Sequence, residues 1–153
     1  MEKDGEFIFV GHSRREDESG GVTPAHSMWT AKLLFNEDGW PLLTPCRYTG
    51  EEARTFSNRD VAGTYDLLFF INTTTATFEH STEYTFNANG TIDQGGNQVG
   101  TFSVSGSYIT VTLNGVDYKG ALADCWNTYT DEGGAICISA VSGLATTIWA
   151  VSK

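Results

Sequence analysis

The chain has 153 residues, about the size of one ordinary domain, with 17 glycines, 3 prolines, 12% aromatic and 18% charged residues. This composition favours strands and turns over helices, and no stretch approaches the roughly 20 apolar residues of a membrane-spanning helix. The formal net charge of −10 makes nucleic acids and anionic membranes poor partners, because both are negatively charged. We therefore expect an all-β protein with no nucleic-acid and no membrane partner.

The first 60 residues differ in charge from the rest of the chain. They contain seven basic and eleven acidic residues, whereas residues 61–153 contain two basic and eight acidic ones. The boundary falls at EEARTFSNRD, residues 51–60, which has no apolar periodicity. We therefore expect a first segment over residues 1–52, a linker over 53–61 and a second domain over 62–153.

The first segment is predicted to hold two or three strands. Glu6–Val10 is a short apolar strand, residues 13–24 are polar and are expected to form a loop, and His26–Phe35 is the next strand. The turn NEDG, residues 36–39, leads into a third apolar run at Trp40. So few strands cannot bury a face alone, so we expect this segment to dock on the second domain or to self-associate.

The second domain is predicted to contain seven or eight antiparallel strands in a small barrel or sandwich. Tyr108–Leu113 alternates strictly between apolar and polar residues, and the Asn114-Gly115 pair that follows is a strong signal for a type I′ hairpin turn. No helical segment of useful length is expected. The predicted strands lie at residues 63–71, 77–86, 99–104, 108–113, 116–126, 135–141 and 147–151.

Three cysteines allow more than one arrangement. Cys125 and Cys137 flank a predicted turn near residues 130–134, and symmetric pairing about residue 131 would place them opposite each other. A cross-strand disulfide is then possible, and two buried thiols that act as small apolar side chains are an equal alternative. Cys46 is expected to be a core thiol.

Two sequences in the first segment resemble a known family. FVGHSRR, residues 9–15, and LLFNEDGWPLLTPCRYTGE, residues 33–51, resemble the end of the catalytic five-bladed propeller of glycoside hydrolase family 43, in its endo-arabinanase branch. The sequence from GTYDLL to TTIWAVSK, residues 63–153, is similar to the β-barrel that follows the propeller in longer members of that branch. The resemblance implies an N-terminal hairpin segment left from a propeller blade, followed by a small antiparallel β-barrel.

The resemblance also implies a role in arabinan degradation. Enzymes of that branch use three carboxylates from earlier blades for inverting hydrolysis of α-1,5-linked arabinan, and nothing in residues 1–52 matches them. We therefore assign no catalytic residue and expect an accessory role: support of an upstream catalytic propeller, or binding of plant cell-wall arabinan. The alternatives are a self-standing barrel that binds carbohydrate or a small ligand, and a purely structural interaction domain. The implied parent is extracellular, although residues 1–10 show no signal peptide.

Three residues are candidate site residues. By the resemblance, His12 matches a histidine that helps to hold a calcium ion in the complete propeller; one imidazole cannot hold calcium, so no cofactor is expected for this chain in isolation. Trp126 and Tyr129 adjoin the polar sequence NTYTDEGG and are predicted to contact glycan, because aromatic faces suit the apolar faces of sugar rings. Tyr108, Tyr118 and Trp149 could stack on sugars in the same way, but most of these aromatic residues are expected in the core.

Overall fold

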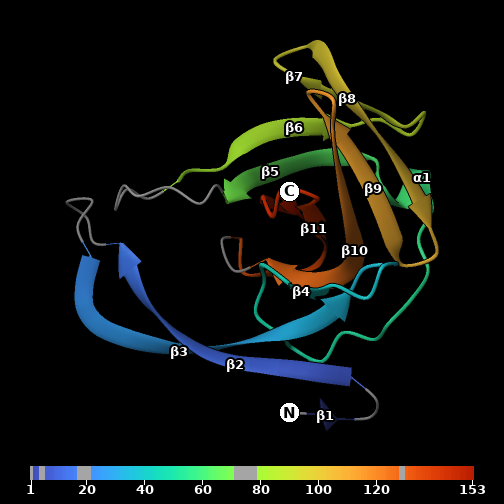
Figure 1. Ribbon diagram of the computed structural model, residues 1–153. Helices are drawn as coiled ribbons and strands as arrows, with labels where there is room; N and C mark the ends of the chain where they lie inside the picture. The colour runs from blue at the N-terminus through green and yellow to red at the C-terminus, as the bar shows by residue number, and fades with distance from the viewer. Residues whose placement is uncertain (1, 4–5, 17–21, 71–78, 128–129) are drawn as a thin grey trace.

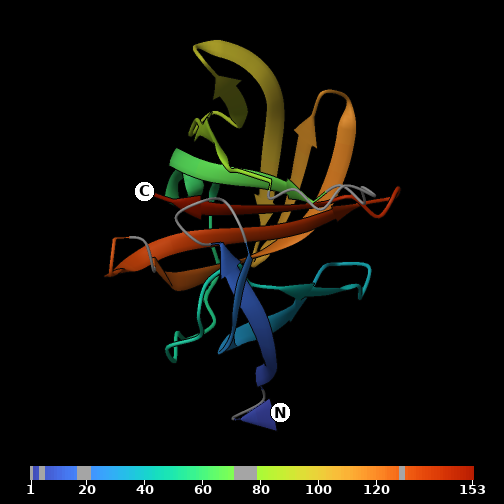
Figure 2. The same ribbon diagram turned by 90° about the vertical axis from the view of Figure 1, so that its left-hand side faces the viewer.

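The structure is a computed structural model that describes residues 2–3, 6–16, 22–70, 79–127 and 130–153. It confirms the all-β prediction. Four strands form an open sheet in the order β1-β2-β3-β4, and eight strands, β5 to β12, form a closed antiparallel barrel. Figures 1 and 2 show the open sheet on one side of the barrel. The described residues include no helix that is long and apolar enough to cross a membrane.

The elements have the following bounds. The open sheet comprises β1 (Glu2–Lys3), β2 (Glu6–Glu16), β3 (Val22–Phe35) and β4 (Pro41–Leu43). Within the described part of the chain the one helix is the short α1 (Asn58–Val61). The barrel comprises β5 (Gly63–Phe70), β6 (Thr82–Phe86), β7 (Thr91–Gln94), β8 (Asn97–Ser105), β9 (Tyr108–Leu113), β10 (Val116–Asn127), β11 (Glu132–Ser142) and β12 (Thr147–Ser152).

The prediction of a loop over residues 13–24 is wrong in part. β2 and β3 remain paired from Phe7 and Leu33 as far as Glu16 and Val22, with a register shift between Arg14 and Glu16. Backbone groups hold an antiparallel ladder, so a charged sequence can extend it as well as an apolar one.

The barrel follows the predicted turns closely. Asn114 and Gly115 have φ of 51° and 78°, as the predicted type I′ turn between β9 and β10 requires. Two short elements were not predicted: β7, and helix α1 within the expected linker. Ser57 caps the N-terminus of α1. Its side chain accepts a hydrogen bond from the Asp60 backbone N–H, and the Asp60 side chain accepts one from the Ser57 backbone N–H, which together form a capping box. Part of the strand predicted at residues 77–86 lies outside the described residues.

Large side chains fill the barrel. The ring of Phe86 packs against those of Tyr65 and Phe102, with centroid distances of 4.8 and 5.1 Å, and all three residues are buried. Tyr118 is buried in the same core, with its ring 6.1 Å from that of Phe69. Tyr118 was expected in the core, and the filled interior resembles that of a small closed barrel whose side chains occupy the space inside.

The open sheet docks on the barrel, which is the first of the two outcomes that the sequence predicted. β4 contacts β11, and β3 contacts β10. Lys119 on β10 pairs with both acids of the NEDG turn: its Nζ lies 2.9 Å from Glu37 Oε1 and 3.0 Å from Asp38 Oδ2. Further along, Arg54 forms a two-bonded ion pair with Asp124. Ionic contacts therefore join the NEDG turn and the segment before α1 to strand β10 of the barrel.

Candidate functional site

One cavity lies at the junction of the open sheet and the barrel. It has a volume of about 370 Å³, and its lining comes from the NEDGWP turn, from β10 and from the turn between β11 and β12. The lining residues are Asn36, Asp38, Trp40, Asp117, Lys119, Val141, Ser142, Gly143 and Ala145. The NEDGWP turn and the DYKG sequence of residues 117–120, both part of the family resemblance, therefore meet at this cavity.

The turn beside this junction cavity is held by Asn36. The Asn36 Oδ1 accepts hydrogen bonds from the backbone N–H groups of Asp38 and Trp40, at 3.1 and 2.9 Å. Gly39 completes the turn with φ of 80°, a conformation that favours glycine. The result is that the Trp40 side chain projects outward and remains 64% exposed.

The polar groups of the junction cavity already have partners. The hydrogen bond to Glu37 and then that to Asp38 raise the pKa of Lys119, because both favour its charged form. Asp117 Oδ1 accepts a hydrogen bond from Thr112 Oγ1 at 2.7 Å. Glu37 and Asp38 therefore hold the junction and Asp117 bonds within the barrel, while the Trp40 ring remains available to a ligand.

The predicted glycan contact Trp126 lies at a second cavity. This cavity is about 630 Å³ in volume and is lined by Arg47, Thr49, Trp126 and Asp131. The Trp126 side chain is 36% exposed, and its Nε1 donates to Asp131 Oδ1 at 3.2 Å. A Cβ added to Gly133 would lie 3.3 Å from the Trp126 ring, so glycine lets the ring lie close to the β10–β11 hairpin. A half-exposed aromatic ring thus adjoins a guanidinium, a hydroxyl and a carboxylate, the groups that bind sugar hydroxyls.

The other two predicted site residues have different outcomes. Tyr129 lies outside the described residues. His12 is exposed on β2, and its Nδ1 lies 2.8 Å from Nδ1 of His26 on β3, with which it shares a hydrogen bond. Among the described residues no third histidine, cysteine or carboxylate joins this pair as a metal ligand. Calcium prefers six to eight oxygen ligands, which two imidazoles do not supply, and the role of His12 at a calcium site of a complete propeller stays a prediction.

Sequence reasoning missed the group of three buried thiols. Cys46, Cys125 and Cys137 place their Sγ atoms within 4.8 Å of one another, and the Sγ atoms of Cys46 and Cys125 are 2.7 Å apart. The expected opposite pairing of Cys125 and Cys137 is wrong: the pairing of β10 and β11 is centred on residue 130 instead of residue 131, so that Cys125 faces Ala135 and Cys137 faces Ala123. The alternative prediction of buried thiols is confirmed. The sequence pattern gave no sign that Cys46 would reach the barrel.

The three thiols influence one another's ionisation. Hydrogen bonds from Cys125 and then from Cys137 lower the pKa of Cys46 to about 5, because they favour its thiolate. The hydrogen bonds to Cys125 and Cys46 raise the pKa of Cys137, and burial raises it further. For Cys125 the hydrogen bond with Cys137 acts to lower the pKa, but the bond to Cys46 and burial outweigh it and leave the pKa raised. Cys46 is therefore the thiol that ionises first.

Known proteins resemble this chain over almost its whole length. It is 29% identical over 132 residues to the extracellular endo-alpha-(1->5)-L-arabinanase 2 of Bacillus subtilis (strain 168), which covers 86% of this chain and 27% of that protein. It is 26% identical over 151 residues to the extracellular endo-alpha-(1->5)-L-arabinanase of Thermotoga petrophila, which covers 96% of this chain and 31% of that protein. The chain thus spans less than a third of these relatives.

Solved structures agree with the fold. The crystal structure of the glycoside hydrolase family 43 protein YxiA from Bacillus licheniformis matches with a TM-score of 0.87 and 27% identity, over 99% of this chain and 33% of that chain. The family model GH43_C, described as a C-terminal lipocalin-like domain, matches residues 45–150. Because this match covers more than half of the chain, the chain belongs to the C-terminal lipocalin-like domain family of glycoside hydrolase family 43.

Proposed function

We propose that this chain is the accessory part of an extracellular arabinan-degrading hydrolase and that it contacts the polysaccharide through the cavity around Trp126. The names of the two arabinanase relatives support the substrate and the location. The observation that carries the glycan contact is the position of Trp126, a half-exposed ring beside Arg47, Thr49 and Asp131 at one cavity. Tyr129 follows on the same hairpin and is proposed as a second contact.

The faces of the open sheet support a catalytic propeller as the partner. Phe7, Phe9 and Phe35 point to one face of this sheet and Val10 and Met28 to the other, and all five are at least 40% exposed. In a soluble antiparallel sheet one face usually packs on the core, and the face exposed to solvent is polar. A sheet with apolar side chains on both faces suits a position beside a propeller blade. Self-association of the isolated chain through these faces stays a prediction.

Affinity electrophoresis through a gel that contains linear arabinan tests the glycan contact. The wild-type chain is expected to migrate more slowly than in a gel without arabinan. Trp126→Ala is expected to weaken this retardation about tenfold, because loss of one stacking ring costs roughly 1.5 kcal/mol. Trp40→Ala is the matched control, since Trp40 is also exposed and lies at the other cavity. Tyr129→Ala tests the second contact in the same gel.

Each outcome of this experiment assigns a role. Retardation that Trp40→Ala abolishes and Trp126→Ala preserves would move the glycan contact to the junction cavity. A wild-type chain that migrates equally with and without arabinan would contradict glycan binding. The accessory role would then be support of the catalytic propeller.

A further inference from the structure

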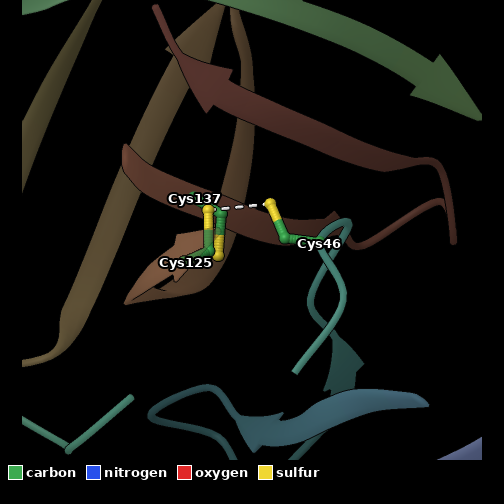
Figure 3. A group of neighbouring side chains, drawn as sticks. All are labelled: Cys46, Cys125 and Cys137. Carbon is green, nitrogen blue, oxygen red and sulfur yellow. Dashed lines mark hydrogen bonds between the residues drawn. The ribbon is translucent and has the colours of Figure 1, made fainter. Parts of the chain in front are cut away.

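The three buried thiols lie where the open sheet meets the barrel. Cys46 follows β4, whereas Cys125 and Cys137 lie on β10 and β11 of the barrel. Figure 3 shows the Cys46 side chain pointing toward the other two from a separate segment. All three residues are at most 4% exposed, and apolar residues that include Leu34 and Val151 surround them. A bond between Cys46 and either barrel thiol would therefore join the two sheets covalently.

The distance between Cys46 and Cys125 favours a covalent bond over a shared metal ion. Their Sγ atoms are 2.7 Å apart, and a disulfide requires about 2.05 Å. Two thiolates on one tetrahedral zinc, each about 2.3 Å from the metal, lie roughly 3.8 Å apart, so a metal would have to push these sulfurs away from each other. Among the described residues no fourth cysteine, histidine or carboxylate joins the cluster, although a structural zinc site needs four ligands.

The strand register selects Cys46 as the partner of Cys125. Cys125 faces Ala135 and Cys137 faces Ala123, so the two barrel cysteines occupy diagonal positions on neighbouring strands. Diagonal neighbours are about 7 to 8 Å apart, whereas a disulfide usually joins Cα atoms 4.4 to 6.8 Å apart. Cys46 reaches Cys125 from a loop and is not subject to this spacing.

We propose that Cys46 and Cys125 are a disulfide-forming pair that links the open sheet to the barrel, with Cys137 left as a thiol beside it. The bond forms by exchange with an external disulfide, R–S–S–R. The Cys46 thiolate attacks one sulfur and releases R–S⁻, and Cys125, after losing its proton, attacks the Cys46 sulfur of the mixed disulfide and releases the second R–S⁻. The two released thiolates take up the two protons, so two chain thiols are oxidised and one external disulfide is reduced to two thiols.

Mass spectrometry after refolding with oxidised glutathione tests the pairing directly. Trypsin leaves Cys125 and Cys137 together on residues 120–153, because no lysine or arginine separates them, and cleavage after Glu132 then divides them. We expect a peptide with Cys46 to be joined to the Cys125 peptide, with one titratable thiol per unfolded chain before reduction and three after it. A Cys125–Cys137 link, or three free thiols after oxidation, would overturn the proposal.

Thermal unfolding of the full chain tests whether the link holds the two sheets. The oxidised chain is expected to melt roughly 10 °C above the reduced chain, because a crosslink between residues 79 positions apart restricts the unfolded state. The difference in melting temperature between the oxidised and reduced chains should persist in Cys137→Ser and vanish in Cys46→Ser and Cys46→Ala. If one equivalent of zinc or monovalent copper copurifies with the chain and the disulfide does not form, the cluster is a metal site and the proposal is overturned.

Discussion

At the scale of single residues, the amide of Asn36 joins the NEDG turn to the barrel. Asn36 is only 3% exposed, and its Oδ1 accepts two backbone hydrogen bonds from its own turn. Its Nδ2 donates to the backbone carbonyl of Lys119 on β10, at 3.3 Å. Only a side chain with both an acceptor and a donor can satisfy the turn and the barrel strand together, and an aspartate would lack the donor.

Replacement of Asn36 should therefore weaken the junction. We expect Asn36→Ala to lower the free energy of unfolding by about 2 to 3 kcal/mol, because buried backbone groups of two elements lose their partner. Urea denaturation monitored by tryptophan fluorescence measures the change. Asn97→Ala is the control, since Asn97 is an exposed turn-side residue, and its effect should stay within about 0.5 kcal/mol. An Asn36→Ala chain as stable as the control would show that the junction does not depend on this amide.

At the scale of elements, strands β10 and β11 approach closely at Gly120. A Cβ added there would lie 2.4 Å from both the Ala140 Cβ and the Ser139 carbonyl oxygen. Backbone cannot yield as the end of a flexible side chain can, so this glycine permits the strand spacing and curvature of the barrel wall.

We predict that Gly120→Ala destabilises the barrel by roughly 1 to 3 kcal/mol through overpacking. Gly143→Ala is the matched control, because a Cβ at Gly143 would meet nothing within 4 Å. Urea midpoints of the two variants measure the effect. A Gly120→Ala midpoint equal to that of Gly143→Ala would show that the two strands can separate at no cost.

The same elements show how far sequence patterns predict this fold. Alternation at Tyr108–Leu113 and the Asn114-Gly115 turn act locally, so β9 and its hairpin could be predicted. β7 is only four residues long, and α1 is a single capped turn, so neither produces a periodic pattern. The extension of β2 through residues 13–16 depends on backbone pairing with β3, the next strand in the chain, and a charged sequence without apolar alternation gives no sign of such pairing.

The candidate sites were predictable only in part. Trp126 could be named because a polar turn follows it in the sequence, which is a local sign of exposure. The junction cavity around Trp40 could not be, since the turn and β10 meet only through tertiary docking. The thiol group was missed because the β10–β11 hairpin is centred earlier than its turn residues suggested, and because Cys46 is 79 residues away from Cys125 in the sequence.

At the scale of the whole molecule, the carboxylates of both cavities have structural partners. Asp38 pairs with Lys119, Asp117 accepts from Thr112, and Asp131 accepts from Trp126. Inverting glycosidases need an acid and a base roughly 6.5 to 9.5 Å apart on opposite sides of the scissile bond, both free to exchange protons. The carboxylates that line the two cavities are instead held by ion pairs or hydrogen bonds within the fold.

The purified chain should therefore release no arabinose oligosaccharides from linear arabinan, whether or not it binds the polymer. Chromatography of the products after long incubation measures this, with the Bacillus subtilis arabinanase as the positive control for the substrate. Activity that coelutes with the chain in gel filtration and disappears in Asp38→Asn or Asp117→Asn would contradict the prediction. It would mean that a carboxylate of the junction cavity leaves its partner and acts on the substrate. Activity that persists in both variants and separates from the chain would come from a contaminating enzyme. Absence of activity would fit the proposed accessory role, in which the catalytic carboxylates come from an upstream propeller.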